Sequence, residues 1–138
     1  MSNAVLILFF AIVIVGVLLL IIISVTRRPL RRLDTAKYQE RWLSISNSVS
    51  DDPSSLQLAV LNADKLLDQA MRERGIAGAS LGERLKNGKS NFQDVNAVWT
   101  AHKLRNRIAH EHDVKLTKHE VTKTLSAFKA GLRDLGAL

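Results

Sequence analysis

Hydrophobic residues follow two different patterns along the chain. The first is a run from Ala4 to Val25, broken only by Gly16 and Ser24, that leaves no polar face. At about 1.5 Å per residue, a helix over this run is about 33 Å long and can cross a hydrocarbon core of about 30 Å. The run is too long for a signal peptide, and no basic segment precedes it. The pattern therefore predicts a retained transmembrane helix within residues 1–26.

The second pattern, after the apolar run, is a spacing of three and four residues that is typical of amphipathic helices. An irregular amphipathic helix is expected from Leu33 to about Val49. Asp51-Asp52-Pro53 then predicts a helix start, with an aspartate cap and proline in the first turn. A clear apolar stripe follows, ended by Gly75 and Gly78; it consists of Leu56, Ala59, Val60, Ala63, Leu66, Leu67, Ala70 and Met71.

Three more helices are expected towards the carboxyl end. A short one covers about Leu81 to Lys86, and the next runs from about Phe92 to His110. The last begins at Thr117, where Glu120 completes a capping box. It presents a seam of Val121, Leu125, Phe128, Leu132 and Leu135.

No stretch alternates with the period of a strand, so an all-α fold is predicted. We expect a membrane anchor over 1–26, a basic juxtamembrane segment and linking helix over 27–53, and a four- to five-helix bundle over 54–138. The pattern leaves open whether residues 33–50 join the bundle or form a stalk.

Charge adds an orientation to this picture. Residues 1–26 carry no charged side chain, whereas Arg27, Arg28, Arg31 and Arg32 follow the apolar run directly. Such clusters stay on the cytoplasmic side, which predicts an outside amino terminus and a cytoplasmic bundle. The four arginines account for most of the net charge of +7, and +3 remains for residues 33–138. The basicity is thus mainly a signal of topology and lipid headgroups rather than of nucleic-acid binding.

Composition excludes several classes of protein. Residues 27–138 have the balance of an ordinary small soluble domain, which excludes a disordered chain and a multi-domain enzyme. The chain has no cysteine, which excludes a disulfide-built scaffold. It also lacks a glycine-rich phosphate loop after a strand, a Gly-x-Ser-x-Gly elbow and an acid pair placed for glycoside chemistry.

The helix over residues 92–110 carries the candidate chemistry. It is apolar on two sides, one of them Ala97, Ala101, Leu104 and Ile108, which predicts a central position in the bundle. On the other side, polar residues continue the face of Val95 and Trp99; these are His102, Arg105, Asn106 and His110. Buried polar groups need partners, so this end is wet, contacts another chain, or is locked in a hydrogen-bond network.

The segment Arg105-Asn106-Arg107-Ile108-Ala109-His110 resembles the Arg-x4-6-His signature of the HEPN superfamily, in which a polar residue, often Asn, follows the Arg. These are small helical-bundle domains, commonly dimeric. Many are metal-independent endoribonucleases, some are toxins, and others are non-catalytic binding modules. The resemblance covers residues 54–135 in helix order, with a six-residue motif. One subgroup has Tyr two residues after the His, where this chain has His112.

The resemblance implies catalytic roles for three residues. His110 would transfer a proton or contact the leaving group, Arg105 would bind phosphate, and Asn106 would orient either of them. On an ideal helix Arg105 and His110 diverge by about 140°. A bent arginine stem, an unwound helix end or a site shared between two chains would bring them together, and the resemblance implies the last, in a homodimer that acts on RNA. The spacings Arg107 to His112 and Arg105 to His112 also fit the pattern.

Other uses of the same residues stay open. Arg105 could pair with an acidic residue, and Asp64, Asp68, Glu83 and Glu111 are the candidates. Asn106 could tie down a loop, and His110 could cap the helix. The domain would then be a non-catalytic interaction module or a purely structural membrane protein.

A metal site is a third interpretation, because histidines and acids are plentiful; the candidates are His102, His110, Glu111, His112, Asp113 and His119. The chain has no His-Glu-x-x-His sequence and no cysteine. We therefore expect neither a metal nor a cofactor.

Overall fold

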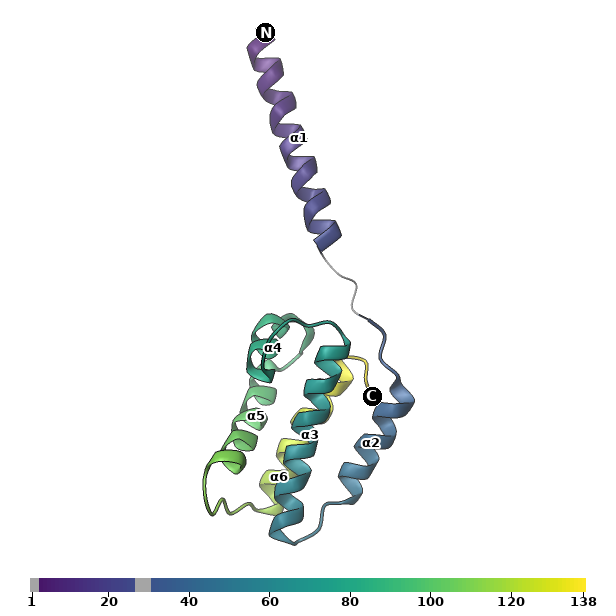
Figure 1. The fold of residues 1–138 in the computed structure, drawn as a ribbon, viewed down its shortest axis with the longest axis vertical. Coiled ribbons are helices and arrows are strands. Elements are labelled where there is room, and N and C mark those ends of the chain that lie inside the picture. The colour runs from purple at the N-terminus through teal and green to yellow at the C-terminus, as the bar shows by residue number, and fades with distance from the viewer. Residues whose placement is uncertain (1–2, 27–30) are drawn as a thin grey trace.

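A computed structural model describes residues 3–26 and 31–138, so the predicted roles of Arg27 and Arg28 lie outside the described residues. The described part is helical and contains no strand. Its elements are α1 (Asn3–Thr26), α2 (Thr35–Asn47), α3 (Pro53–Glu73), α4 (Leu81–Asn87), the 3-10 turn η1 (Lys89–Asn91), α5 (Val95–His110) and α6 (Lys118–Asp134). The predicted all-α class is confirmed, with an apolar amino-terminal helix followed by a five-helix bundle (Figure 1).

Helix α1 is long and apolar enough to cross a membrane. The rest of the chain buries none of the stretch Asn3–Ser24, and Figure 1 shows the helix extending away from the bundle. Its large apolar side chains are exposed among the described residues, and an exposed apolar surface of this extent is typical of a segment that contacts a membrane or another protein.

Helix α3 is the central element of the bundle. Asp52 caps it by accepting a hydrogen bond from the Ser55 amide, and Pro53 occupies the first turn as predicted. The predicted stripe is buried along the length of the helix. At the carboxyl end, Gly75 takes a φ of +84°, and the amides of Gly75 and Ile76 return to carbonyls of the last turn. This αL geometry favours glycine and ends the helix.

The prediction that residues 92–110 form the central helix is wrong. Helix α3 packs against α2, α4, α5 and α6, whereas α5 packs against α3, α4 and α6. Only Val98, Ala101 and His102 of α5 are buried, and the second apolar strip stays largely half-exposed. An apolar strip of small and medium side chains can lie at a groove on the outer surface, so its presence does not show that a helix is surrounded.

Helix α5 also begins later than the pattern predicts. Asp94 caps it by accepting a hydrogen bond from the Ala97 amide at 2.9 Å. Phe92 precedes this cap in an extended conformation and is buried in the core. The hydrophobicity of Phe92 thus reflects its packing in a loop rather than a place on a helix face.

Helix α2 belongs to the bundle. Tyr38, Trp42 and Ile45 are buried in the same core as α3. Between the two helices, Lys37 Nζ lies 3.2 Å from a Glu73 carboxylate oxygen. The hydrogen bond from Gln69 to this carboxylate lowers the pKa of Glu73, and burial raises the pKa of the Tyr38 phenol well above its ordinary value. The packed bundle therefore starts at α2 and not at residue 54.

Helix α6 covers the other side of α3. The predicted capping box is present, because Thr117 accepts from the Glu120 amide at 3.2 Å while the Glu120 carboxylate accepts from the Thr117 amide at 2.9 Å. The bond from the Thr117 amide lowers the pKa of Glu120. All five residues of the predicted seam are buried.

Candidate functional site: a polar cleft between α3, α4 and α5

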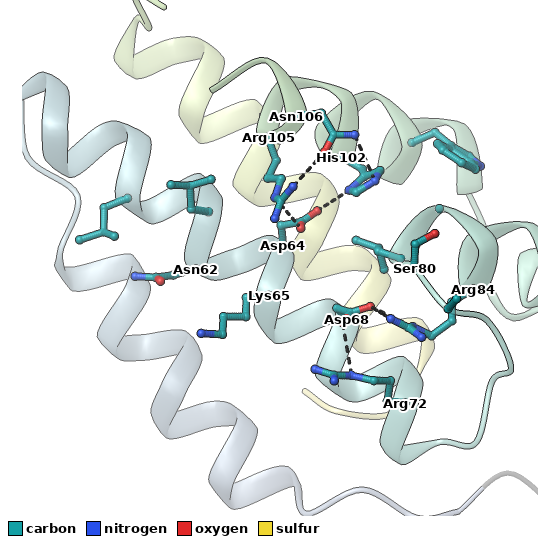
Figure 2. A pocket seen from close by; sticks show the side chains of 16 residues that line it. Asn62, Asp64, Lys65, Asp68, Arg72, Ser80, Arg84, His102, Arg105 and Asn106 are labelled. Carbon is teal, nitrogen blue, oxygen red and sulfur yellow. Dashed lines mark hydrogen bonds and ion pairs between the residues drawn. The ribbon is translucent and has the colours of Figure 1, made fainter. Parts of the chain in front are cut away.

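A cleft of about 940 Å³ lies between α3, α4 and α5, and Figure 2 shows the side chains around it. Helix α3 supplies one wall, α5 the opposite wall, and the start of α4 with the loop before it the third. The polar residues of the lining are Asn62, Asp64, Lys65, Asp68, Arg72, Ser80, Arg84, His102, Arg105 and Asn106. Its volume lies within the range of about 300–1,000 Å³ that small-molecule sites in proteins usually have.

A closed network of four side chains forms the α5 side of this cleft. The Asp64 side chain, whose residue is only 4% exposed, lies 2.7 Å from His102 Nδ1 through Oδ1 and 3.2 Å from Arg105 Nε through Oδ2. Asn106 links the other two members: its Oδ1 accepts from Arg105 Nη1 at 3.0 Å, and its Nδ2 lies 3.3 Å from His102 Nε2. The buried carboxylate is thus paired on both oxygens, as a buried charge requires.

These contacts assign the hydrogen-bonding role of each imidazole nitrogen. The oxygen of Asn106 is used by Arg105, so the amide group that faces His102 is a donor. His102 Nε2 therefore accepts, and Nδ1 donates to Asp64. Both nitrogens have partners within the network. The arrangement orients Arg105 and gives His102 a positioning role rather than a free proton-transfer site.

A second ion pair lies on the α4 side of the cleft and joins α4 to α3. The buried Arg84 of α4 donates through Nη2 to Asp68 at 2.6 Å and also bonds the Gly78 carbonyl. Asp68 holds Arg72 at 3.2 Å as well. This pairing ties α4 and the loop before it to α3, so Arg84 shapes the cleft rather than offering a charge to a ligand.

The cleft has an excess of positive charge. Its lining holds the cations Lys65, Arg72, Arg84 and Arg105 but only two carboxylates, Asp64 and Asp68. Lys65 is exposed and has no partner among the described residues. Arg105 keeps 36% of its side chain exposed. Fixed cations around a concave surface attract anions, so the cleft is suited to a negatively charged ligand.

The structure separates the three predicted catalytic residues. Arg105 and Asn106 line the cleft, whereas His110 is exposed and lies outside the lining. Helix α5 stays regular through His110, which keeps the two motif ends about 140° apart around its axis. Of the four acidic residues considered as partners of Arg105, the structure pairs it with Asp64. Of the three interpretations of this polar face, a hydrogen-bond network is found for His102, Arg105 and Asn106.

Sequence reasoning missed Lys65, Arg84 and Trp99 as members of one cleft. A usable signal was the place of Asp64 in the apolar stripe of α3, four residues after Val60 and three before Leu67. A carboxylate at such a position demands a buried partner. The sequence had no comparable signal for Lys65, because exposed lysines are common on any helix.

The residues considered for metal binding do not gather. His102 is buried in the network, whereas His110, His112 and His119 are exposed. Within residues 3–26 and 31–138, no group of three or more His, Cys, Asp or Glu side chains is placed to hold a metal ion.

No protein-family model matches the chain, and no curated protein or solved structure matches it with statistical significance.

Proposed function

We propose that this chain is a single-pass membrane protein with its amino terminus outside and a cytoplasmic HEPN-like bundle, whose cleft binds the phosphates of a single-stranded RNA. The proposal rests on the cationic excess of the cleft that Arg105 and Asn106 line. The apolar α1 and the arginines that follow it support the membrane placement.

Arg105 is prepared for a phosphate oxygen. Asp64 and Asn106 contact its Nε and Nη1, which leaves Nη2 without a partner among the described residues. A guanidinium that is already oriented loses little side-chain entropy when it binds an oxyanion. Lys65 of α3 also lines the cleft and supplies a second cation, with its side chain extending away from Arg105 (Figure 2).

Trp99 supports a nucleic-acid ligand over a simple inorganic anion. Its indole lines the same cleft, near the His102 ring at a centroid distance of 6.0 Å. Aromatic side chains beside cations are the usual platform for single-stranded nucleic acid, with stacking worth about 1–3 kcal/mol per base.

We expect Lys65→Gln and Arg105→Gln each to weaken RNA binding about tenfold, because each removes one charge-assisted phosphate contact. The measurement is fluorescence anisotropy of labelled single-stranded RNA with the full chain in detergent micelles. Lys103→Gln is the matched control, since Lys103 is exposed on α5 but lies outside the cleft. Equal affinities of the Lys65 and Lys103 variants would show that RNA does not use this cleft.

A second candidate function is metal-independent RNA cleavage at a site shared between two copies. Within one chain His110 is exposed and lies outside the cleft that Arg105 lines, so this candidate requires a second chain to bring the imidazole to Arg105. The RNA 2′-hydroxyl would lose its proton to water as its oxygen attacks the adjacent phosphorus to form a cyclic phosphate. The 5′-oxygen would leave with a proton from His110, while Arg105 stabilises charge on the phosphoryl oxygens. Two copies tethered in one membrane plane would meet at high effective concentration.

The test is RNA cleavage by the full chain in the presence of a metal chelator. Arg105→Ala and His110→Ala should each abolish cutting, whereas Arg107→Ala and His112→Ala should not. A mixture of the two inactive variants should regain about a quarter of the activity, because half of randomly formed dimers then hold one intact shared site. Absent cleavage, or cleavage that survives in both variants, excludes this candidate and leaves the binding function.

A further inference from the structure

The two ends of the bundle are built from different segments. At one end, the guanidinium of Arg74, directly after α3, donates to the Arg31 carbonyl at 2.9 Å. The side-chain amide of Asn87 donates to the Ala77 carbonyl at 2.7 Å. The carboxyl end of α6 is there as well, because Asp134 accepts from the Gln93 amide. We call this the anchor end, because it includes the first described residues after α1 (Figure 1).

The opposite end consists of the loops before α3 and before α6. Lys118 Nζ lies 3.0 Å from the Asp51 carboxylate. The side-chain amide of Gln57 donates to the Val114 carbonyl at 3.0 Å. These contacts bring residues 47–53 and 111–118 together in what we call the distal end, at the bottom of Figure 1.

The ends carry opposite net charge. Segments 31–34, 72–80, 86–94 and 133–138 of the anchor end hold seven Lys or Arg against four Asp or Glu. The two distal segments hold two Lys against four Asp or Glu. Most anchor-end cations are exposed, and these are Arg31, Arg32, Arg72, Lys86, Lys89 and Arg133. Such separation along a small domain produces a field that orients it on a charged surface.

Covalent geometry keeps the anchor end close to the proposed span. Only residues 27–30 lie between Thr26 and Arg31. Even a fully extended chain spans at most about 18 Å over these five steps. That reach is about twice the Debye length of about 8 Å at physiological ionic strength. Because Arg74 donates a hydrogen bond to the Arg31 carbonyl, the end of α3 is also held close to this short connection.

We propose that the basic anchor end of the bundle docks on the headgroups of anionic phospholipids, with the acidic distal end pointing away from the bilayer. This inference rests on the membrane anchor of the proposed function and is independent of RNA binding. Lysines or arginines near an anionic surface contribute about 1 kcal/mol each to such attraction. Lys86 and Lys89 are the most informative of them, because both are exposed and have no partner among the described residues.

The test uses the full chain reconstituted in vesicles of phosphatidylcholine, with or without phosphatidylserine, that also carry a nickel-chelating lipid. The chain has no cysteine, so a nitroxide can be placed at Ser90→Cys on the anchor end or at Ser54→Cys, directly after the distal segment 47–53. Both positions are exposed. Phosphatidylserine should increase the nickel-induced relaxation at position 90 but not at position 54, and high salt should reverse the increase.

Charge variants make the result specific. Lys86→Gln combined with Lys89→Gln should reduce the docked-to-undocked ratio about tenfold or more in phosphatidylserine vesicles. Lys115→Gln combined with Lys123→Gln removes the same charge from exposed positions away from the anchor end and should have no effect. Equal relaxation in both lipids, or equal behaviour of the two double variants, overturns docking while the anchor stands. Release of the chain by alkaline carbonate overturns the anchor and docking together.

Discussion

Asp64→Ala is expected to lower the free energy of unfolding of the bundle by about 3–5 kcal/mol, which is the usual cost of removing one partner of a buried charge pair. The substitution leaves the Nδ1 donor of the buried His102 unpaired and removes the carboxylate beside Arg105. Asn106 cannot replace it, because its oxygen and its amide are already used within the network.

The measurement is urea unfolding of the full chain in detergent micelles, followed by tryptophan fluorescence. Both tryptophans, Trp42 and Trp99, lie in the bundle, so the signal reports the bundle and not α1. Asp51→Ala is the matched control, because Asp51 forms an ion pair on the surface and should cost at most about 1 kcal/mol. Similar losses for the two variants would mean that the network does not hold α5 to α3.

Trp42→Ala is expected to cost about 3–5 kcal/mol, because it removes a large side chain that is only 6% exposed from the contact between α2 and α3. Its neighbour Leu43 is 59% exposed, so Leu43→Ala should change stability by about 0.5 kcal/mol or less. Unfolding of both variants can be followed through Trp99. A small loss for Trp42→Ala would show that α2 is a stalk beside a bundle of four helices.

Local features of the chain were enough to predict most of the helices. The Asp52-Pro53 start, the capping box of Thr117 and the short helix near Leu81 all form as expected, since each depends on residues within one or two turns. The start of α5 was missed because a buried Phe92 in a loop has the same hydrophobicity as one on a helix. Local hydrophobicity reports burial but not the backbone conformation that achieves it.

The candidate site was only partly predictable. The polar residues of α5 were identified because they interrupt an apolar face, and Asp64 was one of four acids considered for Arg105. No pattern within α5 could select Asp64. This carboxylate lies on α3, whereas its partners His102 and Arg105 lie on α5, and the whole of α4 separates the two helices in the sequence. His110 lies one turn beyond Asn106 on nearly the same face of the helix, so only the packed structure shows that the cleft ends before it.

The sequence by itself determined the helical class, the apolar amino-terminal segment, the helix caps and the seam of α6, because all of these depend on short-range periodicity and backbone hydrogen bonding. Only the tertiary structure decided that α3 is central, that α2 joins the core, and that Asp64, His102, Asn106 and Arg105 form one network beside Lys65. Which helix faces meet depends on side-chain packing between segments far apart in the chain. The pattern of a single segment contains no information about the surface that will cover it.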